Sequence, residues 1–272
     1  MKIFISADIE GATGVVHFDE TGPVAAEFAR ARKWMTGDVN AAIEGAMQAG
    51  AGEIWVKDAH GNGRNILIEE LRPEANLVAG WDALISMVQG LDGTFDALLL
   101  IGYHSRAGEE RGILSHTMSN CVKELNLNGR AIGEAELSAL TAGYHGVPTV
   151  FVAGDQSVAE ELSLFTGPIP HAVTKYAMGR ETGRTVHPER TREAIRAGVA
   201  EALSDLKRFK PLKMAGPIEM SVRMALSKQA DAAALTPGVE RRGPDEVACV
   251  VADVPAVLRM FRVMLGLAWS AR

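Results

Sequence analysis

The sequence predicts an α/β fold, a mainly parallel sheet flanked by helices, with a smaller α+β subdomain at its C-terminal end. The first observation is that short apolar runs rich in β-branched residues alternate with longer segments of helical period. Strand, helix and strand in repetition are typical of parallel βαβ units with helices on both faces of the sheet. The second observation is a change of pattern after Lys210, where prolines and alternating segments replace this rhythm. We therefore predict an α/β domain over residues 1–210 and a small α+β subdomain over residues 211–272.

The first part contains six runs that we predict to be strands. They are residues 3–6, 53–57, 76–79, 97–101, 149–152 and 172–176. The segment 24–49 has the length of a crossover helix and is followed by Gly50 and Gly52. Two shorter helices are predicted at 66–71 and 82–89.

A different pattern begins at ELNLNGRAIGE. Asn128-Gly129 is a strong signal for a two-residue hairpin turn, with strands predicted at 124–127 and 130–132. A helix is predicted next, over about residues 134–144. Pro211 and Pro217 then bracket a connector, and strands are predicted at 218–225 and 247–251.

Composition excludes several classes of function. Hydrophobic residues make up 47% of the 272-residue chain and charged residues 23%, the balance of a soluble globular protein. A formal net charge of −6 and the lack of a dense Lys/Arg cluster argue against nucleic-acid binding. No stretch approaches the ~18 continuous apolar residues of a membrane span, and Asp8 interrupts the short apolar run at the start. Cys121 and Cys249 form neither a C-x-x-C motif nor a disulfide framework. They fit two buried thiols in a reducing compartment, so we expect a cytoplasmic protein.

Two carboxylates follow the first predicted strand within the stretch FISADIEG. Asp8 and Glu10 occupy positions i and i+2, which project to the same face of an extended chain. Two like charges held together in a half-buried place repel each other and lose hydration. Some other group must therefore offset this cost.

Other metal-binding side chains stand at the ends of neighbouring strands. Asp58 and His60 follow the second strand, and His104 follows the strand at 97–101. Alone, each Asp is compatible with a turn or cap and each His with a hydrogen-bonded bystander. Ligands nevertheless collect at the carboxyl ends of parallel strands, and oxygen and imidazole donors suit Zn²⁺ or Mn²⁺ in catalytic sites. A dication would convert the repulsion at Asp8 into coordination, and one Asp can bridge two ions.

Two further residues are candidates with open alternatives. His116 lies in ILSHTMS beside small polar residues, where it could equally be a core histidine bonded to backbone. Glu134 lies in the first turn of a predicted helix, where a carboxylate also interacts favourably with the helix dipole. Gly61-Asn62-Gly63 lacks the spacing of a phosphate-binding loop.

Together these residues lie in a set of motifs that is similar to the zinc-dependent D-aminopeptidase family of the DppA type. The matching stretches include SADIEG, VKDAHGN, DALLLIGYHSRAG, LSHTM, LNGRAIGEAELSALTAGYHGVP and VFVAGDQ. They occur in the family's order and cover much of the chain. The C-terminal third resembles the family mainly in layout.

The resemblance implies two zinc ions per chain and His116 as the catalytic residue, proposed in that family as a nucleophile. It implies that Asp8 bridges the ions and that the ligands are Asp8, Glu10, His60, His104 and Glu134. It also implies a small peptide substrate with an N-terminal D-residue, and a homo-oligomeric ring, a decamer, whose active sites face an inner chamber.

Two other functions remain as alternatives to a metal-dependent aminopeptidase. A two-metal phosphoesterase could use the same ligands but would need cations for phosphate, and only Lys57, Arg64 and Arg106 lie near the expected site. A non-catalytic peptide- or metal-binding protein of a transport system would not need His116. We therefore favour peptide hydrolysis.

The closing segment VPAVLRMFRVMLGLAW has helical length and is apolar on nearly every side. Arg259, Arg262 and Gly266 occupy one narrow strip of this predicted helix. A surface helix of a monomer normally has a single apolar stripe. We therefore expect this helix to pack between the two parts of the chain or against another subunit.

Overall fold

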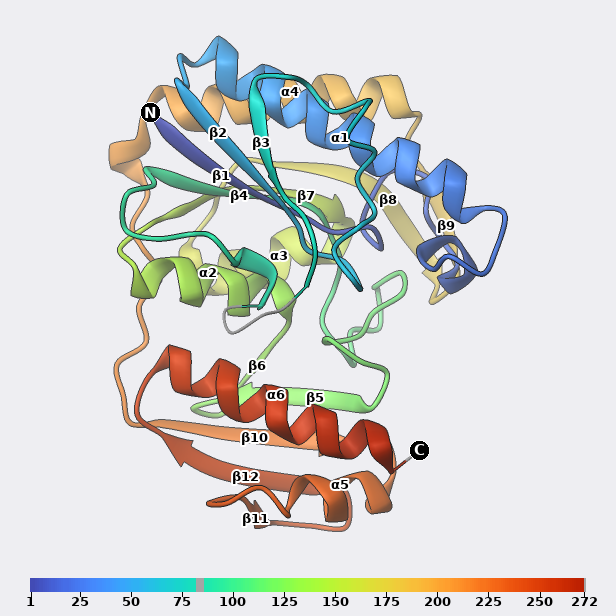
Figure 1. Cartoon of the computed structure of the whole chain (residues 1–272), viewed down its shortest axis with the longest axis vertical. Helices are drawn as coiled ribbons and strands as arrows, with labels where there is room; N and C mark the ends of the chain where they lie inside the picture. The colour runs from blue at the N-terminus through green and yellow to red at the C-terminus, as the bar shows by residue number, and fades with distance from the viewer. Residues whose placement is uncertain (82–85, 272) are drawn as a thin grey trace.

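Two β-sheets, one above the other along the longest axis, organise the chain (Figure 1). The computed structural model describes residues 1–81 and 86–271. The first sheet contains seven strands and the second contains five.

The first sheet has the strand order β3-β2-β1-β4-β7-β8-β9. Neighbouring strands are parallel from β3 to β8, and only β9 is antiparallel. This confirms the predicted α/β class, and each predicted strand of the first part appears within three residues of its expected bounds. The strands are β1 (Lys2–Ala7), β2 (Glu53–Asp58), β3 (Ala75–Val78), β4 (Ala97–Tyr103), β7 (Thr149–Asp155), β8 (His171–Gly179) and β9 (Thr182–Thr185).

Helices cover both faces of this sheet, as Figure 1 shows. One face carries α1 (Phe28–Gln48) and α4 (Pro188–Ser204), and the other carries α2 (Glu134–Tyr144) and α3 (Gln156–Thr166). Alternate residues of β1 serve the two sides: Ile3 and Ile5 pack in the α1/α4 core, and Phe4 packs in the α2/α3 core. A strand buried on both faces is apolar at successive positions, and this continuous apolar run allowed β1 to be predicted from the sequence.

The strand order changes direction beside β1. From β1 the chain moves outward to β2 and β3 on one side, and then returns to β4 and β7 on the other. In open α/β sheets the crevice at such a reversal, beyond the carboxyl ends of the strands, is the usual ligand site. The fold therefore places the ends of β1, β2 and β4 side by side.

Gly11 allows the loop after β1 to approach the end of β4 closely. Its backbone N–H donates to the carbonyl of Gly102 at 2.7 Å. A Cβ at this position would lie 1.7 Å from the carbonyl oxygen of Tyr103. Only glycine fits this approach, which brings the segment with Asp8 and Glu10 against the strand that leads to His104.

The second sheet is antiparallel, with the order β11-β12-β10-β5-β6. The predicted hairpin is confirmed, with Asn128 at φ 50° and Gly129 at φ 74° between β5 and β6. The helix predicted over 134–144 and the strands predicted at 218–225 and 247–251 are present as α2, β10 and β12. The elements are β5 (Val122–Leu127), β6 (Arg130–Ile132), β10 (Ile218–Met224), α5 (Ser227–Ala233), β11 (Glu240–Arg241), β12 (Glu246–Val251) and α6 (Val254–Ser270).

This sheet joins the hairpin at residues 122–132 to strands that lie after residue 217 in the chain. The division into domains at residues 210 and 211 stays a prediction. Helix α6 lies on the side of the second sheet that faces the first (Figure 1). Its residues Val257, Phe261 and Met264 are buried in the core of that second sheet.

Some sequence predictions need correction. Residues 66–71 form a single turn, with one helical hydrogen bond from Leu71 N to Leu67 O, and no helix. The segment is too short to repay the cost of helix nucleation, and Pro73 stops its extension. The helix predicted at 82–89 lies partly outside the described residues. In the part that is described, residues 86–88 form the 3₁₀ helix η2 (Ser86–Val88). Helix α1 begins at Phe28, four residues later than expected.

Several elements of the described chain were not predicted, whereas the state of the two cysteines was. Among the described elements, α3, α4, α5, β9, β11 and the 3₁₀ helices η1 (Phe18–Thr21) and η3 (Leu206–Arg208) were not predicted. Cys121 and Cys249 are both buried and free, as expected. Within residues 1–81 and 86–271, no helix is long and apolar enough to cross a membrane.

Candidate metal centre

The five predicted ligands converge at the carboxyl ends of the central strands. Asp8 and Glu10 follow β1, His60 follows β2, His104 follows β4, and Glu134 is the first residue of α2. Four of them are at least 96% buried, and the side chain of His60 is 16% exposed. Three carboxylates and two imidazoles thus share one buried site.

Asp8 lies between two groups of donors. His60 Nδ1 is 3.2 Å from Asp8 Oδ1 and 2.9 Å from Glu10 Oε2. On the other side, His104 Nε2 is 3.5 Å from Asp8 Oδ2 and 3.5 Å from Glu134 Oε1. The two oxygens of Asp8 therefore face different histidines.

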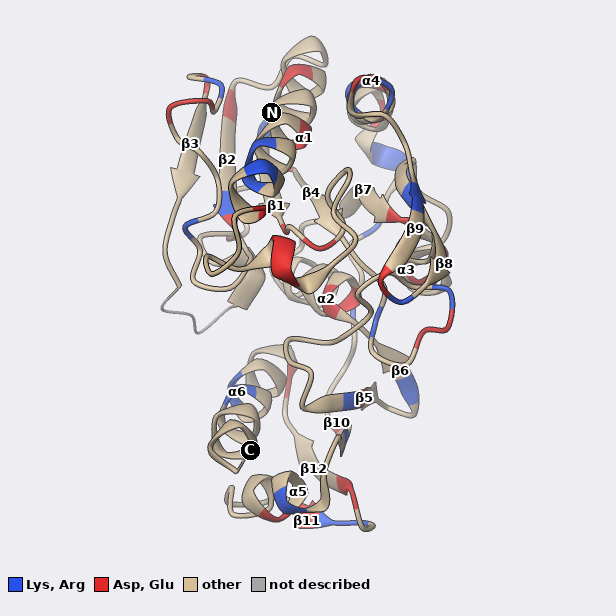
Figure 2. Ribbon diagram, turned by 90° about the vertical axis from the view of Figure 1, so that its right-hand side faces the viewer, with Lys and Arg blue, Asp and Glu red and all other residues tan. Residues whose placement is uncertain are grey.

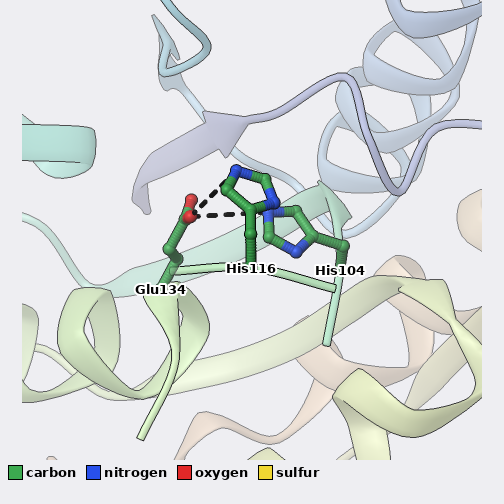
Figure 3. Close-up of side chains that lie close together, drawn as sticks. All are labelled: His104, His116 and Glu134. Atoms are coloured by element: carbon green, nitrogen blue, oxygen red, sulfur yellow. Dashed lines mark ion pairs between the residues drawn. The ribbon is translucent and has the colours of Figure 1, made fainter. Parts of the chain in front are cut away.

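His116 joins the second group (Figure 3). Its ring stacks on that of His104, with centroids 4.2 Å apart and planes 7° from parallel. His116 Nε2 lies 3.6 Å from Glu134 Oε1, and the edge of Phe18 packs against the ring. Glu134 also accepts a hydrogen bond from the backbone N–H of Met118 at 2.6 Å, which orients its carboxylate.

Backbone carbonyls determine which nitrogen of each histidine faces the cluster. A carbonyl only accepts, so the ring nitrogen beside it must carry the proton. His60 Nε2 lies 2.8 Å from Thr21 O, His104 Nδ1 lies 2.9 Å from Ser105 O, and His116 Nδ1 lies 2.8 Å from Leu114 O. In the neutral form of each ring, which is the form that binds a metal ion, the other nitrogen directs a lone pair at the carboxylates, as in metal-ligating histidines.

The charged groups of the cluster shift one another's pKa values. Burial, and then repulsion from Glu10, raises the pKa of Asp8 to about 7. Burial lowers the pKa of His104, but Glu134 and Asp8 outweigh it and raise that pKa to about 10. Attraction between the carboxylates and His60 likewise raises the pKa of His60 well above its ordinary value.

The donor set fits a metal ion. Asp8 Oδ2 and His104 Nε2 are fully buried and have no hydrogen-bond partner among the described residues. Such atoms are rare in folded proteins and indicate that an ion or water belongs there. Oxygen and imidazole donors without thiolate suit Zn²⁺ or Mn²⁺.

Asp58, a candidate from its strand-end position, does not join the cluster. Its carboxylate accepts hydrogen bonds from the backbone of Ile66 at 2.7 Å and from Asn65 Nδ2 at 2.8 Å. Asp58 therefore fixes the turn after His60, which is the structural alternative considered for it.

Lys175, which the sequence analysis missed, supports the loop that carries Glu10. This side chain on β8 is fully buried and donates to the carbonyls of Glu10, Ala12 and Val15. Burial lowers its pKa to about 8. The available signal was a lone lysine in the middle of a largely apolar predicted strand.

A cavity of about 480 Å³ opens on the cluster. Its lining includes Asp8, Glu10, His60, His116 and Glu134, together with Phe18, Trp81 and Met87. One face of helix α6 forms another wall of the cavity. This wall was not predicted, although its residues follow one another at the spacing of one helix face. That face consists of Leu258, Phe261, Arg262, Leu265, Gly266 and Trp269.

Known proteins show the same sequence pattern and the same fold. A family model described as D-aminopeptidase, Peptidase_M55, matches residues 1–263. The D-aminopeptidase of Bacillus subtilis (strain 168) is 33% identical over 269 residues, which cover 98% of each chain. A solved structure, described as "Zn-dependent D-aminopeptidase DppA from Bacillus subtilis, a self-compartmentalizing protease", matches with a TM-score of 0.96 at 33% identity. The match covers 99% of this chain and 98% of that one.

The cluster can be tested with two neighbouring glutamates of α2. Glu134→Gln should lower the bound transition metal by about one ion per chain, because an amide is a much weaker ligand than a carboxylate. Glu136→Gln is the matched control, since Glu136 is equally buried but accepts a hydrogen bond from Gly133 N outside the cluster. Elemental analysis after dialysis against zinc measures the difference. Equal metal content in both variants and the wild type would remove Glu134 from the ligand set.

Proposed function

Because the chain belongs to the Peptidase_M55 family of D-aminopeptidases, we propose that it is a zinc-dependent enzyme that removes an N-terminal D-residue from short peptides or amino-acid amides. The observation that carries this proposal is the position of Asp8, whose two oxygens face two separate sets of donors. The closely similar solved structure is described as zinc-dependent, which supports zinc as the metal.

Two zinc ions per chain fit the donors. Asp8 Oδ1, Glu10 and His60 would hold one ion, and Asp8 Oδ2, His104 and Glu134 would hold the other, so Asp8 would bridge them. Zinc in such a site polarises the scissile carbonyl and lowers the pKa of a bound water toward neutrality. The three carboxylates, buried at high cost in the metal-free chain, would then be charge-compensated.

His116 is the proposed catalytic residue. Burial and the neighbouring His104 lower its pKa, so the ring is neutral at neutral pH. Leu114 O binds the Nδ1 proton, and Nε2 therefore presents a lone pair beside Glu134. This nitrogen can accept a proton from the attacking water and return it to the departing amine, or attack the carbonyl itself.

The alternatives are less well supported. A phosphoesterase would need cations beside the metal cluster to bind phosphate, but the three considered are directed elsewhere. Lys57 is buried and donates to Gly80 O, Arg64 is exposed outside the cavity lining, and Arg106 pairs with Glu161 and Glu109. A binding protein without catalysis would not need a neutral His116 at the cluster.

We also propose that the protein works as a homo-oligomeric ring in the cytoplasm, a decamer with its active sites turned toward an inner chamber. The similar solved structure is described as self-compartmentalizing. Only short or unfolded peptides would then reach the cavity.

Assembly is measured by size-exclusion chromatography with light scattering at micromolar concentration. We expect a mass near ten times the 29.0 kDa of one chain. A monomeric species would contradict the chamber, although hydrolysis in the open cavity would still be possible.

Substrate preference and metal dependence are tested together. The zinc-loaded protein should hydrolyse D-alaninamide and D-alanyl-D-alanine and should leave the L-enantiomers nearly untouched. A strong chelator should abolish this activity, and added zinc should restore it. Release of alanine is the readout, with a generic phosphodiester as the control substrate. Activity that survives removal of all bound metal would refute the proposed chemistry.

His116→Ala should separate chemistry from metal binding. We expect kcat to fall by roughly 10² or more, the usual scale for a lost acid–base group, while the zinc content stays at the wild-type level. Steady-state kinetics and elemental analysis give the two values. Loss of zinc in this variant would make His116 a ligand, and full activity would exclude it from the mechanism.

A further inference from the structure

The α6 wall of the cavity carries an arginine that the proposed chemistry does not use. Arg262 is the only lysine or arginine among the described residues that line the cavity. It forms no hydrogen bond or ion pair with any residue in the described part of the chain. Most other arginines in the described part of the chain are paired; Arg196, for example, binds both Glu44 and Glu193.

Charge is therefore distributed unevenly over the cavity walls. The ends of β1 and the start of α2 contribute the carboxylates Asp8, Glu10 and Glu134, whereas α6 contributes the guanidinium of Arg262. A short peptide has its scissile bond near one end and a carboxylate at the other. When the scissile bond lies at the cluster, the guanidinium of the α6 wall is the positive charge in the described lining that can bind this carboxylate.

Gly266 leaves open space on the face of α6 that carries Arg262. It lies four residues later, on the same face of α6, and also lines the cavity. A glycine inside a helix costs about 1 kcal/mol relative to alanine. A Cβ at this position would nevertheless meet no atom within 4 Å, so packing in this chain does not require the glycine.

We propose that Arg262 binds the C-terminal carboxylate of the substrate and selects peptides of two or three residues with a free carboxylate over amides and longer chains. This inference rests on the proposed aminopeptidase function. The planar fork of arginine binds a carboxylate through two parallel hydrogen bonds. The cavity of about 480 Å³ is within the usual size range of small-molecule sites.

The test compares D-alanyl-D-alanine with its C-terminal amide in the zinc-loaded full-length protein. Arg262→Gln should raise KM for the dipeptide at least about tenfold and leave kcat nearly unchanged, because the carboxylate takes no part in breaking the amide bond. Kinetics with the amide should not change. Arg262→Lys should restore part of the dipeptide affinity.

Arg259→Gln is the matched control, since Arg259 is exposed on the same helix but does not line the cavity. It should behave as the wild type with both substrates. Equal effects of Arg262→Gln on dipeptide and amide, or no effect on either, would overturn the assignment.

Failure of the proposed function has a different signature, because the wild type would then cleave neither substrate. Calorimetric binding of D-alanyl-D-alanine to zinc-loaded His116→Ala, with and without Arg262→Gln, tests the inference without turnover. A dissociation constant raised about tenfold by the second substitution supports it, and an unchanged value refutes it.

Discussion

Mutual repulsion among three buried carboxylates is the constraint on which the rest of this structure depends. Asp8, Glu10 and Glu134 are each less than 5% exposed and share one site. Histidines supply part of the compensating charge, yet Asp8 Oδ2 and His104 Nε2 have no hydrogen-bond partner within the described chain. A cluster of this kind is stable when cations satisfy it, and zinc would do so while also supplying the chemistry of amide hydrolysis.

The fold holds these groups in place by backbone interactions. Gly11 lets the loop after β1 touch the end of β4, and Lys175 binds three carbonyls of the same loop. The second nitrogen of each cluster histidine is bonded to a carbonyl. The donors are thus oriented before any ion binds, which limits the reorganisation needed for binding and catalysis.

The parts of this arrangement that the sequence could predict are local. Continuous apolar runs identified the strands of the first sheet, and the polar residues after them pointed to the site. Glu134 and His116 were assigned only by resemblance, because their positions after a hairpin and within a loop carry no distinctive spacing. Asp58 had the same strand-end signal as the others but bonds to its own turn.

Long-range pairing could not be predicted from the sequence. The hairpin around Asn128 pairs with β10, and Asn128 N donates to Glu219 O across 91 positions of the chain. The α6 wall depends on the same pairing, because α6 packs on the second sheet. Figure 2 shows α6 between this sheet and the first part of the chain. The helix predicted at 66–71 failed for a local reason, a single turn ended by Pro73.

Anomalous X-ray scattering at the zinc edge, from crystals of the zinc-loaded protein, tests the central claim most directly. The account predicts two zinc peaks on either side of Asp8, one beside Glu10 and His60 and the other beside His104 and Glu134. No peak at Asp8, or zinc bound only elsewhere on the chain, would contradict it.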